Sequence, residues 1–272
     1  MVLFVSDLDN TLIYSYKKDI GNRILVEEKD GKKLSYMTEE AYQMMSVLSD
    51  QVSFVPVTTR SMEQYNRIRF PEHLRTGKRT PEYALVSNGG ILLHNGEIEN
   101  EWLAESMAVK RESEEEMEKG MNILEYTKDR DLDVRLVDGL FVFTKVKNPE
   151  RTLEQLNTAL DPDQVSLFSN GEKVYIFPKK MSKAWAVRRL KERLRPHITA
   201  AAGDSMFDIG MLEEADVSFY PNELHGMIRE RRGRIDCEIG RDSFLSNVVL
   251  QYLKDCFSVQ AVPMTGENQE ND

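Results

Sequence analysis

The sequence predicts an α/β fold, in which a mostly parallel sheet carries a smaller inserted unit of the α+β type. Short apolar runs alternate with helical segments toward both ends of the chain, a pattern typical of a parallel sheet covered by helices. Two hairpin patterns and an acidic helical stretch lie between these parts and indicate an additional unit. With 272 residues, of which 40% are hydrophobic, the chain is large enough for one core with an insert.

The first part of the chain alternates between apolar strand patterns and amphipathic helical patterns. Its segments are strand 2–6, a polar ribbon at 14–37, helix 38–49, strand 52–57, a helix from Ser61, a basic loop at 67–79 and strand 83–87. Thr38 followed by Glu39 and Glu40 is typical of a helix start. The Asn88-Gly89-Gly90 sequence after the third strand is typical of a turn.

The middle of the chain follows a different pattern. Residues 104–129 are helical and strongly acidic, which is typical of a solvated helix face. One hairpin turns at Asp138-Gly139 and another at Asn170-Gly171, with a helix at 149–160 between them. We expect residues 92–178 to form the inserted α+β unit.

Alternating strands and helices then resume. They are helix 183–195, strand 198–202, a helix ending near Leu212, strands 217–219 and 235–239, and helix 244–257. The core is therefore expected to combine residues 1–91 and 179–258. Residues 259–272 are polar and acidic and are expected to be disordered.

Composition excludes several classes of protein. The net charge of −10 argues against general nucleic-acid binding, and no apolar run approaches the roughly 18 residues that span a bilayer. The first apolar run lacks a basic lead-in, so no signal peptide is expected. Cys237 and Cys256 form no CxxC motif, which disfavours zinc or a disulfide framework and favours the reducing cytoplasm.

Two carboxylates, Asp7 and Asp9, follow the first strand. Side chains at i and i+2 of a strand point the same way. Two carboxylates that lie side by side in this way repel each other unless a cation lies between them or one of them holds a proton. The pair suits a divalent metal, or a nucleophile beside an acid/base. The alternative is a helix N-cap formed by Asp9-Asn10-Thr11, and these residues alone leave both interpretations open.

Further chemical groups follow other predicted strands or open helices, where α/β sheets gather their sites. Thr58 ends the second strand beside a helix start, whose N–H groups suit an anion. Lys183 opens a helix, and one turn would bring the carboxylates of Asp204 and Asp208 to the same side. Each group also has an ordinary interpretation: a helix cap formed by Thr58, Thr59 and Ser61, or by Asp204-Ser205, and a surface lysine for Lys183.

The order of these groups resembles the four motifs of the haloacid dehalogenase superfamily of phosphohydrolases, which use an aspartate nucleophile. Asp7-Leu-Asp9-Asn10-Thr11 is similar to the DxDxT motif, and residues 57–61 resemble the TGR-type turn. Residues 181–183 resemble the lysine motif, and residues 203–208 resemble GDxxxD. The resemblance implies a Rossmann-like core. The insert resembles the C2-type cap of the type IIB branch, which includes Cof-like enzymes and sucrose-phosphate phosphatase.

The resemblance implies a Mg²⁺-dependent phosphatase that acts through an aspartyl-phosphate on a small phosphorylated metabolite, such as a sugar or glycosyl phosphate. Asp7 would be the nucleophile and Asp9 the acid/base, while Thr58 and Lys183 would offset the charge of the phosphoryl group. The residues implied as Mg²⁺ ligands are Asp7, Asp9 through its backbone carbonyl, Asp204 and Asp208. The residues expected to bind substrate are Thr59, Arg60, Asn88 and Gly89.

Two residues depart from the family pattern, because Thr59 replaces the usual glycine and Phe207 the usual asparagine. Neither change removes a group that performs chemistry, so an enzyme remains the leading interpretation. A phosphomutase on the same scaffold and a non-catalytic phospholigand sensor are the alternatives, and the acid/base Asp9 disfavours the sensor. We expect no membrane or nucleic-acid partner, and a protein partner stays unknown.

Several basic residues are candidates for substrate or partner contacts. Lys145, Lys147 and Lys173 lie in the predicted hairpins of the insert, where they either select the leaving group or are ordinary exposed lysines. The arginine-rich stretches 67–79 and 229–234 suit a second phosphate, a polyanion or an acidic partner, or are solvated loops.

Overall fold

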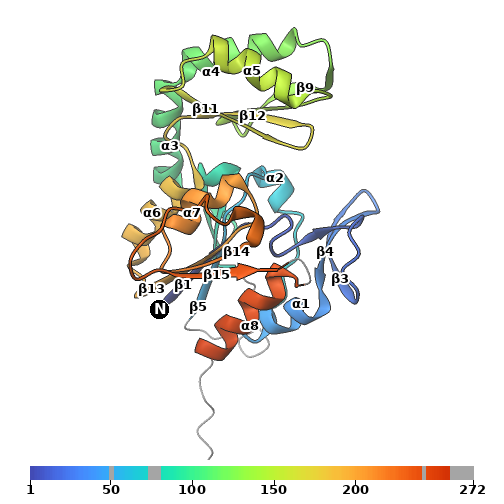
Figure 1. Ribbon diagram of the computed structural model, residues 1–272, viewed down its shortest axis with the longest axis vertical. Coiled ribbons are helices and arrows are strands. Elements are labelled where there is room, and N and C mark those ends of the chain that lie inside the picture. The colour runs from blue at the N-terminus through green and yellow to red at the C-terminus, as the bar shows by residue number, and fades with distance from the viewer. Residues whose placement is uncertain (49–51, 73–80, 241–242, 258–272) are drawn as a thin grey trace, which may run out of the picture.

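The structure is a computed structural model that describes residues 1–48, 52–72, 81–240 and 243–257. These residues form a core, with helices on both faces of a sheet, and a second unit beyond one end of that core (Figure 1). Within the described residues, the core sheet has five parallel strands in the order β15-β14-β13-β1-β5. They are β15 (Ile235–Ile239), β14 (Val217–Pro221), β13 (Ile198–Ala202), β1 (Val2–Ser6) and β5 (Val52–Pro56).

Alternate residues of β1 point to opposite faces of the sheet, as the period of a strand requires. Val2 and Phe4 pack in one apolar cluster, and Leu3 and Val5 in another. The helices that contribute to these clusters are α1 (Glu39–Ser46) and α8 (Leu245–Phe257) on the first face, and α6 (Lys183–Leu194) and α7 (Ile209–Glu213) on the second. Because β1 is buried on both faces, its sequence is continuously apolar rather than alternating.

The parallel register brings three strand ends together. Ser6, the last residue of β1, pairs with Pro56 of β5 and with Ala202 of β13. The chain segments that follow these strands therefore leave the sheet side by side, at the edge where open α/β sheets bind their ligands.

Within the described chain, a three-stranded antiparallel sheet extends the core beyond β5, through a parallel bridge between Val57 and Leu85. Its strands are β6 (Tyr83–Val86), β7 (Ile91–His94) and β8 (Glu97–Ile98). The sequence pattern assigned residues from 92 onward to the insert, but β7 pairs with β6 and β8 pairs with β7. We therefore propose that the insert starts after β8, near α3 (Asn100–Glu112).

The polar ribbon expected at residues 14–37 is a separate antiparallel sheet. Its strands, in sheet order, are β2 (Tyr14–Ser15), β4 (Lys32–Thr38) and β3 (Arg23–Lys29). Thr38 ends this sheet and caps α1, because its hydroxyl accepts a hydrogen bond from the backbone N–H of Ala41 at 3.1 Å. The predicted helix start at Thr38 is confirmed.

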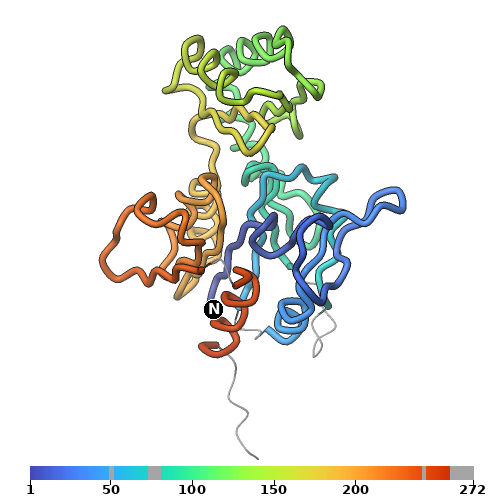
Figure 2. The backbone as a smooth tube through the Cα atoms, turned by 45° about the vertical axis from the view of Figure 1, so that its right-hand side comes forward, coloured from blue at the N-terminus to red at the C-terminus, as the bar shows by residue number. Residues whose placement is uncertain are grey.

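The inserted unit is an antiparallel sheet with helices on one face. Its strands, in sheet order, are β11 (Val165–Asn170), β12 (Lys173–Pro178), β10 (Phe141–Val146) and β9 (Arg130–Val137). Helices α4 (Glu114–Glu125) and α5 (Pro149–Ala159) cover the face away from the core, and two chain segments join the unit to the core (Figures 1 and 2).

The two faces of β12 have different neighbours. Val174 and Ile176 pack in an apolar cluster with residues of α4 and α5. Tyr175 and Phe177 instead belong to a cluster that continues into the core. The side of the inserted sheet that faces the core is therefore aromatic.

The acidic helical stretch expected at 104–129 is divided into two helices. Ser113 separates α3 from α4, with backbone angles φ −108° and ψ 10°, and its hydroxyl donates a hydrogen bond to the carbonyl of Gln164 at 2.6 Å. The first predicted hairpin turn agrees with the structure, because Asp138 and Gly139 both have the positive φ of a two-residue turn, 47° and 74°.

Some expectations fall partly outside the described residues. Residues 73–79 of the basic loop and the tail at 259–272 belong to this group.

Cys237 and Cys256 are free cysteines. In the part of the chain that is described, none of the helices has the length and apolar character needed to cross a membrane.

Candidate active site

Asp7 and Asp9 begin the loop after β1. The backbone N–H of Asp7 continues the sheet by donating to the carbonyl of Ala202 at 2.9 Å, and Asp7 is 7% exposed. Residues 10–12 form a turn rather than a helix, with Asn10 at φ 63°. The helix-cap interpretation of Asp9 is therefore wrong.

Lys183 is buried between two carboxylates. Its ammonium group donates to an oxygen of Asp7 at 2.5 Å and to an oxygen of Asp208 at 2.6 Å, and its side chain is 2% exposed. Burial alone lowers the pKa of Lys183, but the charges of Asp208 and Asp7 outweigh it and raise the pKa above its ordinary value. Ser182 fixes the start of α6 by capping the N–H of Trp185 at 3.2 Å. The surface-lysine interpretation of Lys183 is wrong.

Asp208 is held from its other side by the loop after β13. Its second carboxylate oxygen accepts hydrogen bonds from the backbone N–H groups of Asp204 and Ser205, at 3.2 and 3.0 Å, and from the Ser205 hydroxyl at 2.8 Å. A side chain at Gly203 would lie 2.3 Å from the Cβ of Asp208. The glycine therefore permits the tight loop that places the two aspartates.

Three carboxylates form a group able to hold a metal. One oxygen each from Asp7, Asp204 and Asp208 lie within 4.8 Å of one another. Burial, together with the neighbouring Asp208, raises the pKa of Asp204 to about 7. Burial also raises the pKa of Asp7 well above its ordinary value, although Lys183 opposes this. The raised pKa values mean that Lys183 alone does not supply enough positive charge to keep these carboxylates ionised. Their hard oxygen donors suit a small divalent cation, which would supply the rest.

Arg60 binds Asp9 with two parallel hydrogen bonds, both 2.8 Å long. Partial desolvation by itself raises the pKa of Asp9, but the hydrogen bonds and the charge of Arg60 outweigh it, so the pKa is lowered. The same guanidinium contacts Glu27 at 2.9 Å, and Arg67 contacts Glu27 at 3.2 Å. The second arginine-rich stretch, at residues 229–234, forms its contacts elsewhere. For example, Arg231 pairs with Asp216 of the core.

Sequence reasoning missed Glu27, which is only 3% exposed. Strand alternation does not identify it, because register shifts on both sides of Glu27 interrupt the pairing of β3 with β4. Such bulges re-aim side chains without a signature in the apolar pattern.

Thr58 follows Val57, whose backbone N–H donates to the carbonyl of Ser6, the residue before Asp7, at 2.7 Å. Thr58 is 1% exposed, its backbone N–H donates to the carbonyl of Leu85 at 2.9 Å, and its hydroxyl accepts from the backbone N–H of Arg60 at 3.2 Å. The helix that follows, α2 (Met62–Tyr65), is capped by Ser61 instead. The predicted helix cap is therefore confirmed for Ser61, while Thr58 and Thr59 do not serve as the cap.

Asn88 and Gly89 lie at the junction between the core and the insert. The Asn88 side chain donates to the carbonyl of Met181 at 3.3 Å, which ties the turn between β6 and β7 to the segment that leads from the insert into α6. The Trp102 indole donates to the carbonyl of Gly89 at 3.0 Å. The predicted turn is confirmed by the positive φ of Asn88 and Gly89, whereas substrate binding by these two residues stays a prediction.

Aromatic side chains lie between the insert and the core. Phe207 extends from the loop that carries Asp204 and Asp208, and its ring centroid lies 4.8 Å from Phe168 and 5.3 Å from Tyr175. Phe207, one of the two residues that depart from the family pattern, therefore packs against the inserted sheet.

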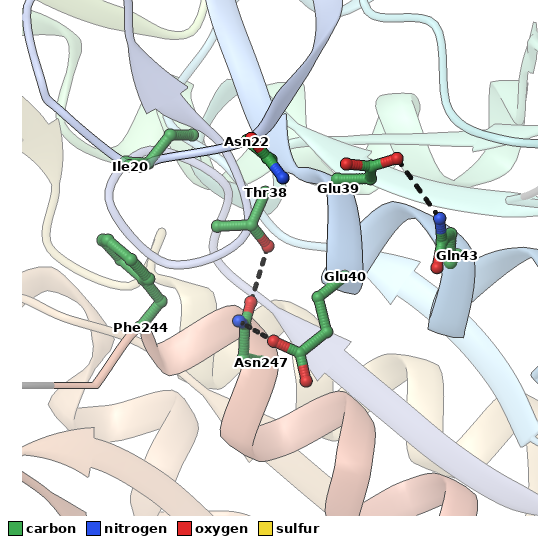
Figure 3. A pocket seen from close by; sticks show the side chains of 8 residues that line it. All are labelled: Ile20, Asn22, Thr38, Glu39, Glu40, Gln43, Phe244 and Asn247. Atoms are coloured by element: carbon green, nitrogen blue, oxygen red, sulfur yellow. Dashed lines mark hydrogen bonds between the residues drawn. The ribbon is translucent and has the colours of Figure 1, made fainter.

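The volume of a cavity does not identify the candidate active site. A cavity of about 460 Å³ lies between α1 and α8 (Figure 3), and its lining does not include the aspartates of the candidate active site. Its polar side chains satisfy one another, since Thr38 donates to Asn247 at 2.6 Å and Asn247 donates to Glu40 at 2.6 Å. A cavity of about 320 Å³ includes Asp204 in its lining and adjoins the site.

Solved structures of similar fold agree with this architecture. The sucrose-phosphatase of Synechocystis sp. PCC6803, in complex with sucrose and phosphate, is 18% identical, with a TM-score of 0.62 over 93% of this chain and 97% of its own. The C-terminal domain of C. albicans trehalose-6-phosphate phosphatase is 14% identical, with a TM-score of 0.56 over 93% and 90%. The HAD subclass IIB sugar phosphatase BT4131 is 9% identical, with a TM-score of 0.57 over 93% and 99%. These likenesses confirm the predicted Rossmann-like α/β fold.

Sequence comparison identifies the family. A search of curated proteins gave no match. The profile of the haloacid dehalogenase-like hydrolases matches residues 78–220, which is more than half of the chain. The chain therefore belongs to the haloacid dehalogenase-like hydrolase family.

Proposed function

We propose that the protein is a Mg²⁺-dependent phosphatase that hydrolyses a small phosphomonoester through an aspartyl-phosphate on Asp7. The contact of Lys183 with both Asp7 and Asp208, next to Asp204, carries this proposal. Phosphoryl transfer needs a nucleophile, a fixed cation and ligands for a metal ion in one buried site, and this contact supports those roles for the residues named.

Four residues have separate roles in the proposed reaction: Asp7, Asp9, Thr58 and Lys183. A carboxylate oxygen of Asp7 attacks phosphorus while the bond to the leaving oxygen breaks, and Asp9 gives that oxygen its proton. Asp9 then takes a proton from water, whose oxygen attacks phosphorus and releases Asp7. Lys183 and the Thr58 hydroxyl stabilise the charge on the transferred group.

Asp7, Asp204 and Asp208, with the backbone carbonyl of Asp9, would hold the Mg²⁺. When bound, the cation offsets the negative charge of the carboxylates and the phosphoryl group. The reducing cytoplasm is the proposed setting, in agreement with the free Cys237 and Cys256.

Arg60 controls when Asp9 is able to act. Paired with Arg60, Asp9 stays ionised and is a poor acid, because its pKa is lowered. A phosphoryl group is a strong alternative partner for a guanidinium. Substrate entry would therefore draw Arg60 away from Asp9 and raise the pKa of that carboxyl for the protonation step.

A sugar or glycosyl phosphate is the proposed substrate. The similar solved proteins are named as phosphatases of sucrose-phosphate, of trehalose-6-phosphate and of sugars. The inserted unit, as a cap over the acidic pair, would enclose the leaving group and exclude water.

The test is phosphate release from a panel of phosphomonoesters with Mg²⁺, with Asp7→Asn as the blank. We expect release by the native protein and none by the variant, whose neutral amide is a poor nucleophile but matches the carboxylate in size. Equal release by both proteins would overturn the mechanism. Turnover that requires a sugar bisphosphate activator would instead favour the phosphomutase, and binding without turnover would favour the sensor.

A further inference from the structure

Tyr175 of β12 lies in the aromatic layer between the insert and the core. The residue is 7% exposed. Its ring centroid lies 5.2 Å from Phe143, 5.7 Å from Phe177 in a stacked arrangement, and 5.3 Å from Phe207 in an edge-on arrangement. Residues from both the insert and the core therefore hold the ring in place.

Within the part of the chain that the structure describes, the Tyr175 hydroxyl forms no hydrogen bond with another residue, and it is not among the side-chain atoms that are both buried and unpaired. The hydroxyl therefore reaches solvent, although most of the residue is buried. It is free to donate a hydrogen bond to a group that enters the space between the insert and the core.

Tyr175 lies within electrostatic reach of the catalytic residues. Burial raises its pKa first, and the negative charge of Asp9 raises it further. The phenol therefore stays protonated near neutral pH and is able to donate a hydrogen bond. Lys173, two residues away on the same strand, acts in turn on the pKa of Asp9, so this end of β12 lies over the acidic pair.

We infer that the Tyr175 hydroxyl binds a hydroxyl group of the leaving alcohol of the proposed sugar phosphate. The inference rests on the proposed phosphatase function. The aromatic side chains present a largely apolar wall, and one placed polar group on such a wall is the usual way to orient a small ligand. The same arrangement makes Tyr175 a specificity-determining residue that discriminates against leaving groups without a hydroxyl.

The variant Tyr175→Phe removes only the hydroxyl and keeps the ring in its packing. It is compared with the native protein on two substrates: the hexose monophosphate that the native enzyme hydrolyses fastest among glucose 1-phosphate, glucose 6-phosphate and mannose 6-phosphate, and 4-nitrophenyl phosphate, whose leaving group carries no further hydroxyl. We expect kcat/KM to fall by about tenfold or more for the hexose monophosphate, as the loss of one hydrogen bond to a positioned group predicts. For 4-nitrophenyl phosphate we expect less than a twofold change.

Tyr126→Phe is the matched control, because Tyr126 is 85% exposed and the same substitution there should change neither rate. A Tyr175→Phe variant that loses activity equally on both substrates, or on neither, overturns the inference. So does a native enzyme that hydrolyses 4-nitrophenyl phosphate but none of the three hexose monophosphates. Failure of the proposed function looks different, because 4-nitrophenyl phosphate would then be hydrolysed equally by the native protein and by Asp7→Asn, or by neither.

Discussion

The guanidinium of Arg60 binds both carboxylate oxygens of Asp9, at 2.8 Å each. This pairing stabilises the ionised form of Asp9, whereas a residue that protonates a leaving group must hold a proton. The geometry of the site therefore predicts that Arg60 sets the pH at which the enzyme is active.

The variant Arg60→Met tests this relation. The pKa of Asp9 is lowered by Arg60, so the free enzyme loses its protonated acid at a lower pH than it otherwise would. Removing the guanidinium raises that pKa, and the basic limb of the kcat/KM profile for 4-nitrophenyl phosphate should move to higher pH. KM should also rise, because a phosphate-binding group is lost. Arg60→Lys keeps the charge without the two parallel bonds and should show a smaller shift. An unmoved basic limb in Arg60→Met contradicts the prediction.

Replacing Lys183 with methionine should destabilise the protein and abolish turnover. The buried ammonium is shared by Asp7 and Asp208, and breaking a buried ion pair by removing one partner costs about 3–5 kcal/mol. Activity should fall by roughly 10³-fold or more, because a fixed cation at the phosphoryl group is lost. Urea unfolding and phosphate release measure the two effects.

The control is Lys180→Met, three residues earlier in the chain. Lys180 also forms a 2.5 Å ion pair, with Glu112, but both side chains are more than half exposed. Exposed pairs contribute only about 0–1 kcal/mol, so this variant should stay stable and active. Similar losses in both variants would show that the buried pairing of Lys183 has no special role.

The strands of the core were predictable because burial on both faces leaves a continuous apolar run, as in β1, and short polar residues mark where each run ends. Asp7, Thr58, Asp204 and Asp208 were predictable for the same reason, since parallel strands bring their ends to one edge. Lys183 follows no strand of that sheet, and only the order of the family motifs assigned it to the site. The contact of Lys183 with two carboxylates was not predictable, because it depends on the path of α6 across the sheet.

Other features have no local signature. Glu27 turns inward because of a bulge in β3, and Phe207 packs against a sheet formed by distant residues. Residues of β7 and β8 from 92 onward were assigned to the insert because no strand was predicted between the turn at 88–90 and the acidic helical stretch. The contacts of Glu27 and Phe207 depend on residues far apart in the sequence, whereas β7 pairs with the neighbouring β6.

Mg²⁺ should stabilise the protein more at high pH than at low pH. The pKa of Asp204 is raised from 3.8 to about 7, so without a cation the folded state binds this proton more tightly than the unfolded state. The stability that the proton contributes is lost as the pH rises from about 4 to about 7. Mg²⁺ needs the deprotonated carboxylates and competes with that proton.

The measurement is the rise in Tm on adding Mg²⁺ at pH 5.5 and at pH 8, at constant ionic strength. We expect a small rise at pH 5.5 and a clearly larger one at pH 8. In Asp204→Asn the rise should be weak at both pH values. An equal rise in the native protein at both pH values would contradict the link between Asp204 and the cation.

Gly89 and Gly96 form a matched pair for testing the close packing between the turn at Gly89 and α6. Both have φ of +85°, but a Cβ at Gly89 would lie 2.2 Å from the Cβ of Ala186 in α6, whereas a Cβ at Gly96 meets nothing within 4 Å. Gly96→Ala should therefore cost only the strain of a positive φ, about 1–2 kcal/mol. Gly89→Ala carries the same strain and also forces α6 away from the junction, which should add about 1–3 kcal/mol. Because α6 begins at Lys183, only Gly89→Ala should also lower kcat. Unfolding in urea and the rate on 4-nitrophenyl phosphate measure both effects, and equal losses in the two variants would mean that the close packing against Ala186 does not position Lys183.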